Sequence, residues 1–147
     1  MKIAIIGVGA MGSIYAGLLA DEGGHDVHAI DKWQKHVDTI NTKGLRVEGA
    51  SGDRTVKLSA STDGSGADGA ELVIVATKHD GVGDAARLAL KLAKPDAPIL
   101  TIQNGLGSAD QVAEIVGSDR IMMGVVGGFG ASMKGPGHAH HNGMEFL

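Results

Sequence analysis

The sequence predicts an α/β domain with a doubly wound, mostly parallel sheet that is covered by helices on both faces. Short apolar runs alternate along the chain with segments whose apolar residues recur at helical spacing. That alternation is typical of βαβ units, which build parallel sheets. The first apolar run leads directly into a glycine-rich turn, and the second ends on an acidic residue. Together, these observations favour one domain that fills residues 1–147.

Composition sets the limits of this domain. The 147 residues suffice for one core and are too few for two, and 43% hydrophobic with 20% charged residues is typical of a soluble globular protein. The net charge of -4 is mild and scattered, so neither a nucleic acid nor a membrane is expected as a partner. The chain has no cysteine, which excludes disulfides, thiolate-bound zinc and thiol catalysis. We expect a cytoplasmic protein.

Buried strands are predicted where short apolar runs lie between turn-forming or polar residues. These runs are residues 3–6, 27–30, 72–76, 99–102 and 121–126.

Helices are predicted where apolar residues share one face at helical spacing. They cover residues 11–22, 33–43, 82–92 and 108–116. Their ends carry Gly23-Gly24, Gly44, and Pro95 with Pro98, and Ser108 with Gln111 has the form of a capping box that opens the fourth helix.

Two further segments do not belong to this alternation. Residues 45–58 alternate in polarity around a turn at 49–53, which predicts a half-exposed hairpin, and a polar loop at 61–69 follows. After Gly135-Pro136-Gly137 the chain stops on apolar residues without a helix cap or a charged end. We therefore expect that it was truncated before a further domain.

The segment Gly7-Val8-Gly9-Ala10-Met11-Gly12 has the pattern G-x-G-x-x-G between a predicted strand and a predicted helix. In a dinucleotide site Gly7 permits the tight turn, Gly9 lets the backbone approach a diphosphate, and Gly12 lets the helix pack on the strand. The helix N-terminus then offers N–H groups to the anion. A glycine-rich turn without a ligand is the alternative, and no Walker-type lysine follows the loop.

Asp31 closes the second strand about 20 residues after the loop, where a carboxylate binds the adenosine ribose. It would accept a hydrogen bond from the 2′-hydroxyl and favour NAD(H), whereas the adjacent Lys32 could pair with a 2′-phosphate and favour NADP(H). An ordinary helix cap is the alternative role for Asp31.

Polar residues also follow the next two strands, namely Thr77-Lys78 and Gln103-Asn104-Gly105. In a doubly wound sheet these strand ends lie beside the glycine loop and line one crevice. Lys78 could hold phosphate, ribose or an anionic substrate, and Asn104 could bind ribose or substrate. A solvated lysine and an Asn-Gly turn are the simpler alternatives.

The histidine-rich stretch His138, His140 and His141 resembles a metal tract, but its spacing also suits alternate faces of a strand. No carboxylate or cysteine pattern accompanies it, so no metal site is predicted.

Several motifs together resemble the ketopantoate reductase (2-dehydropantoate 2-reductase) family over essentially the whole chain. They are the glycine loop and residues 40–45, 73–78, 102–107, 123–124 and 135–138. The resemblance implies reduction of the 2-keto group of ketopantoate with NADPH, on the route to pantothenate. It also implies that Lys78 and Asn104 contact cofactor and substrate, and that a helical C-terminal domain absent from this sequence carries the catalytic lysine.

The sequence departs from the family at Asp31, because the family usually places a basic residue there for the 2′-phosphate. NAD(H) and a related 2-hydroxy acid dehydrogenase activity therefore stay open. An S-adenosylmethionine methyltransferase, which Gly12 disfavours, and a non-catalytic nucleotide-sensing domain are alternatives of other classes. The sequence leaves the oligomeric state open, and a homodimer is compatible with it.

Overall fold

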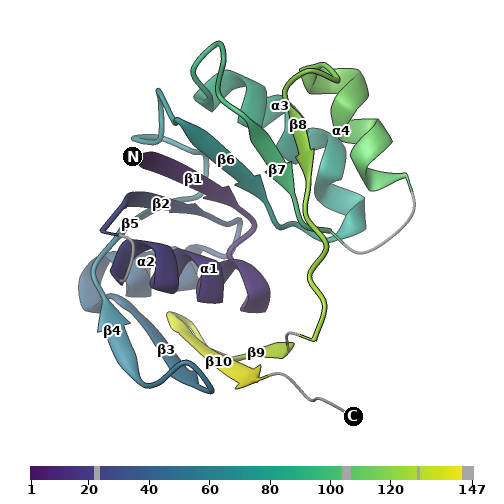
Figure 1. Ribbon diagram of the computed structural model, residues 1–147. Coiled ribbons are helices and arrows are strands. Elements are labelled where there is room, and N and C mark those ends of the chain that lie inside the picture. The colour runs from purple at the N-terminus through teal and green to yellow at the C-terminus, as the bar shows by residue number, and fades with distance from the viewer. Residues whose placement is uncertain (22–23, 104–106, 129, 144–147) are drawn as a thin grey trace.

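Six parallel strands form the central sheet of the computed structural model, which describes residues 1–21, 24–103, 107–128 and 130–143 (Figure 1). Every neighbouring pair of these strands is parallel, so the predicted fold class is confirmed. In spatial order the strands are β5 (Ser59–Ser61), β2 (Asp26–Ile30), β1 (Lys2–Ile6), β6 (Leu72–Val75), β7 (Ile99–Thr101) and β8 (Ile121–Met123).

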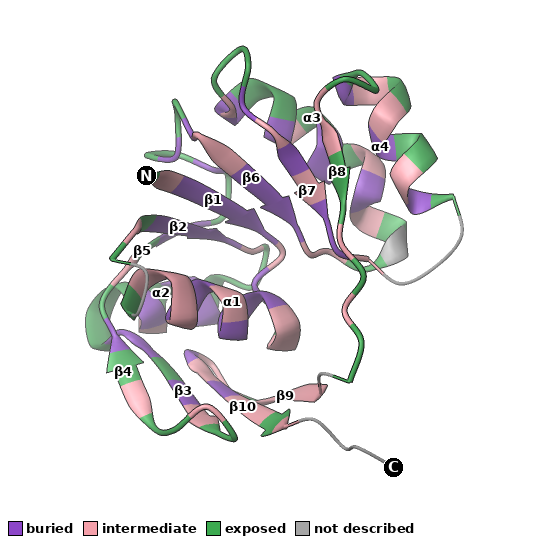
Figure 2. Cartoon of the chain, viewed as in Figure 1, coloured by how far each residue is buried: buried purple, intermediate pink, exposed green. Residues whose placement is uncertain are grey.

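Helices cover both faces of this sheet, which explains why its strands are apolar on both sides (Figure 2). In β1, Ile3 and Ile5 enter one core cluster, while Ala4 and Ile6 enter the other. The helices α1 (Ala10–Asp21) and α2 (Gln34–Lys43) lie on one face, and α3 (Val82–Leu92) and α4 (Ser108–Val116) lie on the other. A short 3₁₀ helix, η1 (His79–Gly81), precedes α3.

A second sheet packs on the outer side of α1. Its order is β4 (Arg54–Val56), β3 (Leu45–Gly49), β10 (His138–Gly143) and β9 (Gly130–Gly135). The β3–β4 pair is antiparallel, so the predicted hairpin is confirmed, and β10 adds parallel to β3. Helix α1 contacts strands of both sheets and is therefore buried between two layers.

Some predicted boundaries and roles are wrong. The capping box at Ser108 does not exist, because Gly107 is the N-cap of α4, with a φ of 88°, and Ser108 already lies inside the helix. An edge strand that was not predicted, β5, directly precedes the predicted loop at 61–69 and includes its first residue, Ser61. This strand pairs with β2. The helix predicted from residue 33 begins at Gln34, because Trp33 is its N-cap and is 43% exposed, and His36 lies on the buried face.

Two predicted elements end earlier in the structure than in the prediction. The strand predicted at 121–126 ends at Met123, and α1 ends at Asp21, before the predicted stop at Gly23, which lies outside the described residues. No helix among the described residues has both the length and the apolar character needed to cross a bilayer.

Candidate functional site

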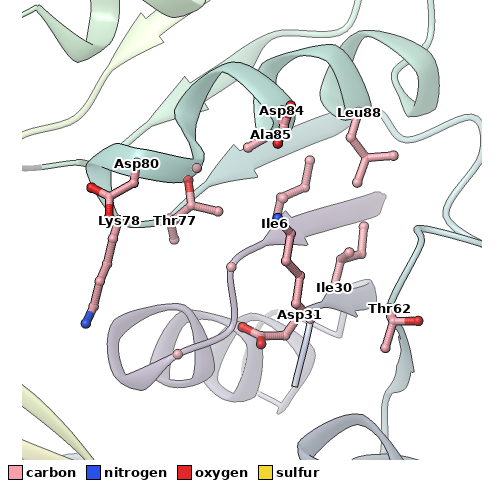
Figure 3. A pocket seen from close by; sticks show the side chains of 15 residues that line it. Ile6, Ile30, Asp31, Thr62, Thr77, Lys78, Asp80, Asp84, Ala85 and Leu88 are labelled. Atoms are coloured by element: carbon pink, nitrogen blue, oxygen red, sulfur yellow. The ribbon is translucent and has the colours of Figure 1, made fainter. Parts of the chain in front are cut away.

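The carboxyl ends of β1, β2 and β6 surround a cleft of about 420 Å³ (Figure 3). Parallel sheets of this order place their ligands at this edge, where the strand order reverses. One end of the cleft is apolar, with Ile30 on the sheet side and Ala85 and Leu88 on α3. Lys78 lies at the opposite end. The cleft is thus long, and its two ends differ in chemistry.

The glycine loop is fixed between β2 and β6 by close backbone contacts. The Gly7 N–H group donates to the Ile30 carbonyl oxygen at 2.8 Å, and Gly7 has a φ of +92°. A Cβ atom on Gly7 would lie 2.7 Å from the backbone nitrogen of Thr77, and one on Gly12 would collide with the Gly7 carbonyl oxygen. Both glycines are therefore required by the protein's own packing.

Gly9 differs from these two glycines, because a Cβ atom there would meet no protein atom within 4 Å. Gly9 is exposed and lines the cleft, so protein packing does not explain why a side chain is missing. The first turn of α1, beginning at Ala10, carries no acidic side chain. Its N–H groups and its positive dipole end suit a phosphate group. Of the remaining loop residues, Val8 is fully buried and Met11 faces a neighbouring cavity.

Asp31 lies at the edge of the cleft without capping a helix. Its Oδ1 atom accepts a hydrogen bond from the Trp33 N–H group at 2.9 Å, and its own N–H group donates to the Ser61 carbonyl oxygen at 3.2 Å. Helix α2 begins only at Gln34, so the alternative role as its cap is wrong. Lys32 also lines the cleft, but its side chain is exposed.

Gln103 joins the ends of β6 and β7, a role that the sequence did not reveal. Its Nε2 atom donates to the carbonyl oxygen of Thr77 at 2.7 Å and to the Thr77 hydroxyl at 2.8 Å. This pair of bonds fixes the backbone directly before Lys78. The only sequence signal was a polar residue at the carboxyl end of a central strand.

Lys78 lies between the main cleft and a second cavity of about 270 Å³. Met11, Ile102, Gln103 and Val126 also line this second cavity. The structure thus brings Thr77 and Lys78 to the glycine loop, as predicted. Asn104, the other predicted contact, lies outside the described residues.

His36 supports the glycine loop from behind, and sequence reasoning missed it. Its ring is completely buried, and its Nδ1 atom accepts a hydrogen bond from the Gly137 N–H group at 2.7 Å. Its Nε2 atom lies 3.5 Å from the Ser13 hydroxyl, which in turn donates to the Val8 carbonyl oxygen at 2.8 Å. The available signal was its position beside Val37 and Ile40 on one face of α2.

The histidine-rich tail forms strand β10, with alternate side chains on opposite faces. His138 and His140 lie 3.2 and 3.4 Å from the carboxylate of Glu48, which also pairs with Arg46 at 3.0 Å. Across the described ranges, no group of three or more histidine, cysteine, aspartate or glutamate residues has an arrangement that could hold a metal ion.

The chain matches the family model described as "Ketopantoate reductase PanE/ApbA" over residues 3–147. It belongs to the ketopantoate reductase family. The chain is 37% identical over 140 residues to a 2-dehydropantoate 2-reductase of Pyrococcus abyssi. The aligned region covers 93% of this chain and 43% of that protein. The resemblance expected from the sequence motifs is confirmed.

Solved structures agree with this placement in the ketopantoate reductase family. A ketopantoate reductase of Ralstonia eutropha JMP134 is 38% identical with a TM-score of 0.86, and covers 97% of this chain and 47% of that one. D-mandelate dehydrogenase, solved with NADH and anilino(oxo)acetate, is 32% identical with a TM-score of 0.87, over 97% and 46% of the two chains. The chain spans less than half the length of each of these relatives.

Proposed function

We propose that residues 1–147 form the dinucleotide-binding part of a reductase that converts a 2-keto acid, 2-dehydropantoate foremost, into the 2-hydroxy acid with a nicotinamide cofactor. The observation that carries the proposal is Gly9, whose missing side chain leaves space in the cleft and relieves no contact within the protein. Membership of the ketopantoate reductase family supports the reaction type over a methyltransferase or a nucleotide sensor.

The cleft offers a partner for each part of a dinucleotide. The loop from Gly7 to Gly12 and the start of α1 would bind the diphosphate. Ile30, Ala85 and Leu88 form the apolar end that fits adenine. Asp31 and Lys32 lie where the adenosine ribose would be, and Thr77 and Lys78 would be near the nicotinamide. The family resemblance implies that Asn104 contacts the nicotinamide ribose and the substrate.

The chemistry that a dihydronicotinamide would supply in this cleft is a hydride for a ketone carbon. This chain's own residues bind and orient the reactants. They bring the reacting atoms together and form no covalent bond with either of them. The Lys78 ammonium, placed between the two cavities, suits a 2-keto acid carboxylate or a cofactor phosphate. We assign no proton donor within residues 1–147, and place it in a further domain, as the family resemblance implies.

A related 2-hydroxy acid dehydrogenase is the second candidate. The likeness to D-mandelate dehydrogenase, with a TM-score of 0.87, favours it, because that protein was solved with NADH. The two candidates share the same cleft and differ in the substrate.

The nucleotide-binding proposal is tested by calorimetric titration of the purified chain with NADH, NADPH and ADP-ribose. We expect binding of an adenine dinucleotide, and we expect no turnover of 2-keto acids by this chain alone. Absence of binding to all three nucleotides would contradict the proposal. Robust turnover would contradict the placement of the proton donor in another domain.

The variant Gly9→Val tests the observation that carries the proposal. Because its side chain meets open space, we expect an unchanged melting temperature and an affinity reduced by at least about tenfold. Gly135→Val is the matched control, since Gly135 in β9 has equally open surroundings but lies away from the cleft. Equal affinities of the two variants would count against the site.

A further inference from the structure

The carboxylate of Asp31 is held in a fixed position at the cleft. The backbone of Asp31 is bonded to Ser61 of the edge strand β5, and its Oδ1 atom is bonded to the Trp33 N–H group. Trp33 in turn stacks on the buried ring of His36, with ring centroids 5.3 Å apart and an interplanar angle of 15°. These contacts restrict the rotation of the Asp31 side chain.

The position of Asp31 is next to the place that the adenosine ribose must occupy. Ile30, the preceding residue, borders the apolar end that suits adenine, and Gly9 marks the diphosphate position. Figure 3 shows the Asp31 carboxylate between that apolar end and the glycine loop. A carboxylate there accepts a hydrogen bond from a 2′-hydroxyl group and repels a 2′-phosphate, which carries about two negative charges.

The remaining charges around the cleft do not reverse this preference. Lys78 also lines the cleft, but it lies at the end opposite the apolar one. Asp80 and Asp84 line the wall opposite the glycine loop and add negative charge. Lys32 is the nearest cation in sequence, but its side chain is exposed and carries a long flexible stem. A solvated lysine that must be ordered before it can pair contributes little, whereas the fixed carboxylate acts in every conformation.

We infer that this site selects NADH over NADPH, and that Asp31 is the residue that determines the selection. This inference rests on the proposed function, and it departs from the NADPH use that the family resemblance implies. Lys32 then lies at the rim of the cleft and does not determine which cofactor binds.

The test measures the affinities of the purified chain for NADH and NADPH by calorimetry. Trp33, the single tryptophan of the chain, provides an independent fluorescence signal two residues from Asp31. We expect NADH to bind at least about tenfold more tightly than NADPH. Asp31→Asn keeps an oxygen for the Trp33 N–H group and removes the charge, so we expect the preference to shrink by about tenfold through a gain in NADPH affinity.

A control variant separates this effect from changes in folding or total charge. Asp38→Asn makes the same charge change on α2, where the Asp38 side chain is exposed and bonded to Gln34, so we expect the nucleotide preference to stay unchanged. Lys32→Ala is a second test and not a control, because Lys32 lines the same cleft. We expect it to change the preference by less than about threefold, and a larger change would assign the selection to Lys32.

Tighter binding of NADPH by the parent chain, or a preference that Asp31→Asn leaves unaltered, would overturn the inference while the proposed function stands. If neither nucleotide binds, the proposed function itself fails.

Discussion

At the residue scale, His36 shows how a buried side chain can fix the proton positions behind a binding loop. Because the Gly137 N–H group donates to Nδ1, that nitrogen carries no proton, and the neutral ring holds its proton on Nε2. Nε2 faces the Ser13 hydroxyl, which donates to Val8 of the glycine loop. A second proton on the ring would place two N–H groups against each other at Gly137.

The pH dependence of stability follows from this arrangement. Burial lowers the pKa of His36, although the nearby Asp31 carboxylate raises it. In the unfolded chain the ring has a pKa of about 6.5. The contribution of the neutral His36 ring to the free energy of unfolding is complete above about pH 6.5. It is lost as the pH falls below this value, because the unfolded chain then binds the extra proton. In urea unfolding experiments we expect His36 to contribute a decline in the free energy of unfolding of up to about 1.4 kcal/mol per pH unit as the pH falls below about 6.5.

His28 must be separated from His36 in this measurement. Burial, together with Lys2, lowers the pKa of His28 as well, so its contribution has the same sign. We therefore expect His36→Gln and His28→Gln each to flatten part of the pH dependence. If His36→Gln leaves the slope unaltered, the buried ring is not the group that titrates.

At the element scale, the position of α1 between two sheets determines its composition. A helix with one buried face needs large apolar residues along a stripe, whereas a helix between two layers needs small residues where a layer approaches closely. Gly17 is such a position, because a Cβ atom there would lie 2.6 Å from Cγ2 of Val47 in β3. The glycine is thus explained by packing against the second sheet and not by the nucleotide.

Gly17→Ala is expected to destabilise the protein, although alanine is the better helix former by about 1 kcal/mol. The overlap with Val47 should dominate and lower the free energy of unfolding by about 1–3 kcal/mol in a chemical denaturation experiment. Gly83→Ala in α3 is the matched control, because its Cβ atom would make only ordinary contacts at 3.5 Å. We expect Gly83→Ala to stabilise the protein, so an equal loss in both variants would refute the packing explanation.

At the scale of the whole molecule, the chain returns from β8 to complete a sheet that began far earlier in the sequence. β10 pairs with β3, with His138 opposite Arg46, and Gly137 binds His36 at the same place. Ala139 in β10 is fully buried in the core cluster that also contains Ile14 of α1. The C-terminal hairpin therefore supports the helix that carries the glycine loop.

Ala139→Asp should disrupt this packing, since it buries a charge without a partner. We expect a loss of at least about 3 kcal/mol, a melting temperature lower by about 10 °C, and weaker nucleotide binding. The control is Asn142→Asp, an exposed change on the same strand that keeps the oxygen bonded to Ser132. Normal melting of Ala139→Asp would show that β10 is not needed to hold α1.

Local patterns were sufficient for much of the fold and for part of the candidate site. The alternation of strands and helices, the loop from Gly7 to Gly12, and the clustering of Asp31 with Lys78 depend on neighbours in sequence and on the order of a parallel sheet. Local signals failed at Ser108, where Gly107 is the cap instead, and at the edge strand β5, which only its pairing with β2 identifies.

Periodicity and missing Cβ atoms act over a few residues, so the amino-acid order was enough to predict the doubly wound sheet and the glycine loop. Long-range packing determines that β10 pairs with β3, that His36 lies behind the loop, and that Gln103 bonds to Thr77. These contacts join residues that are far apart in the chain, and no local pattern encodes the partner that a buried polar group will find.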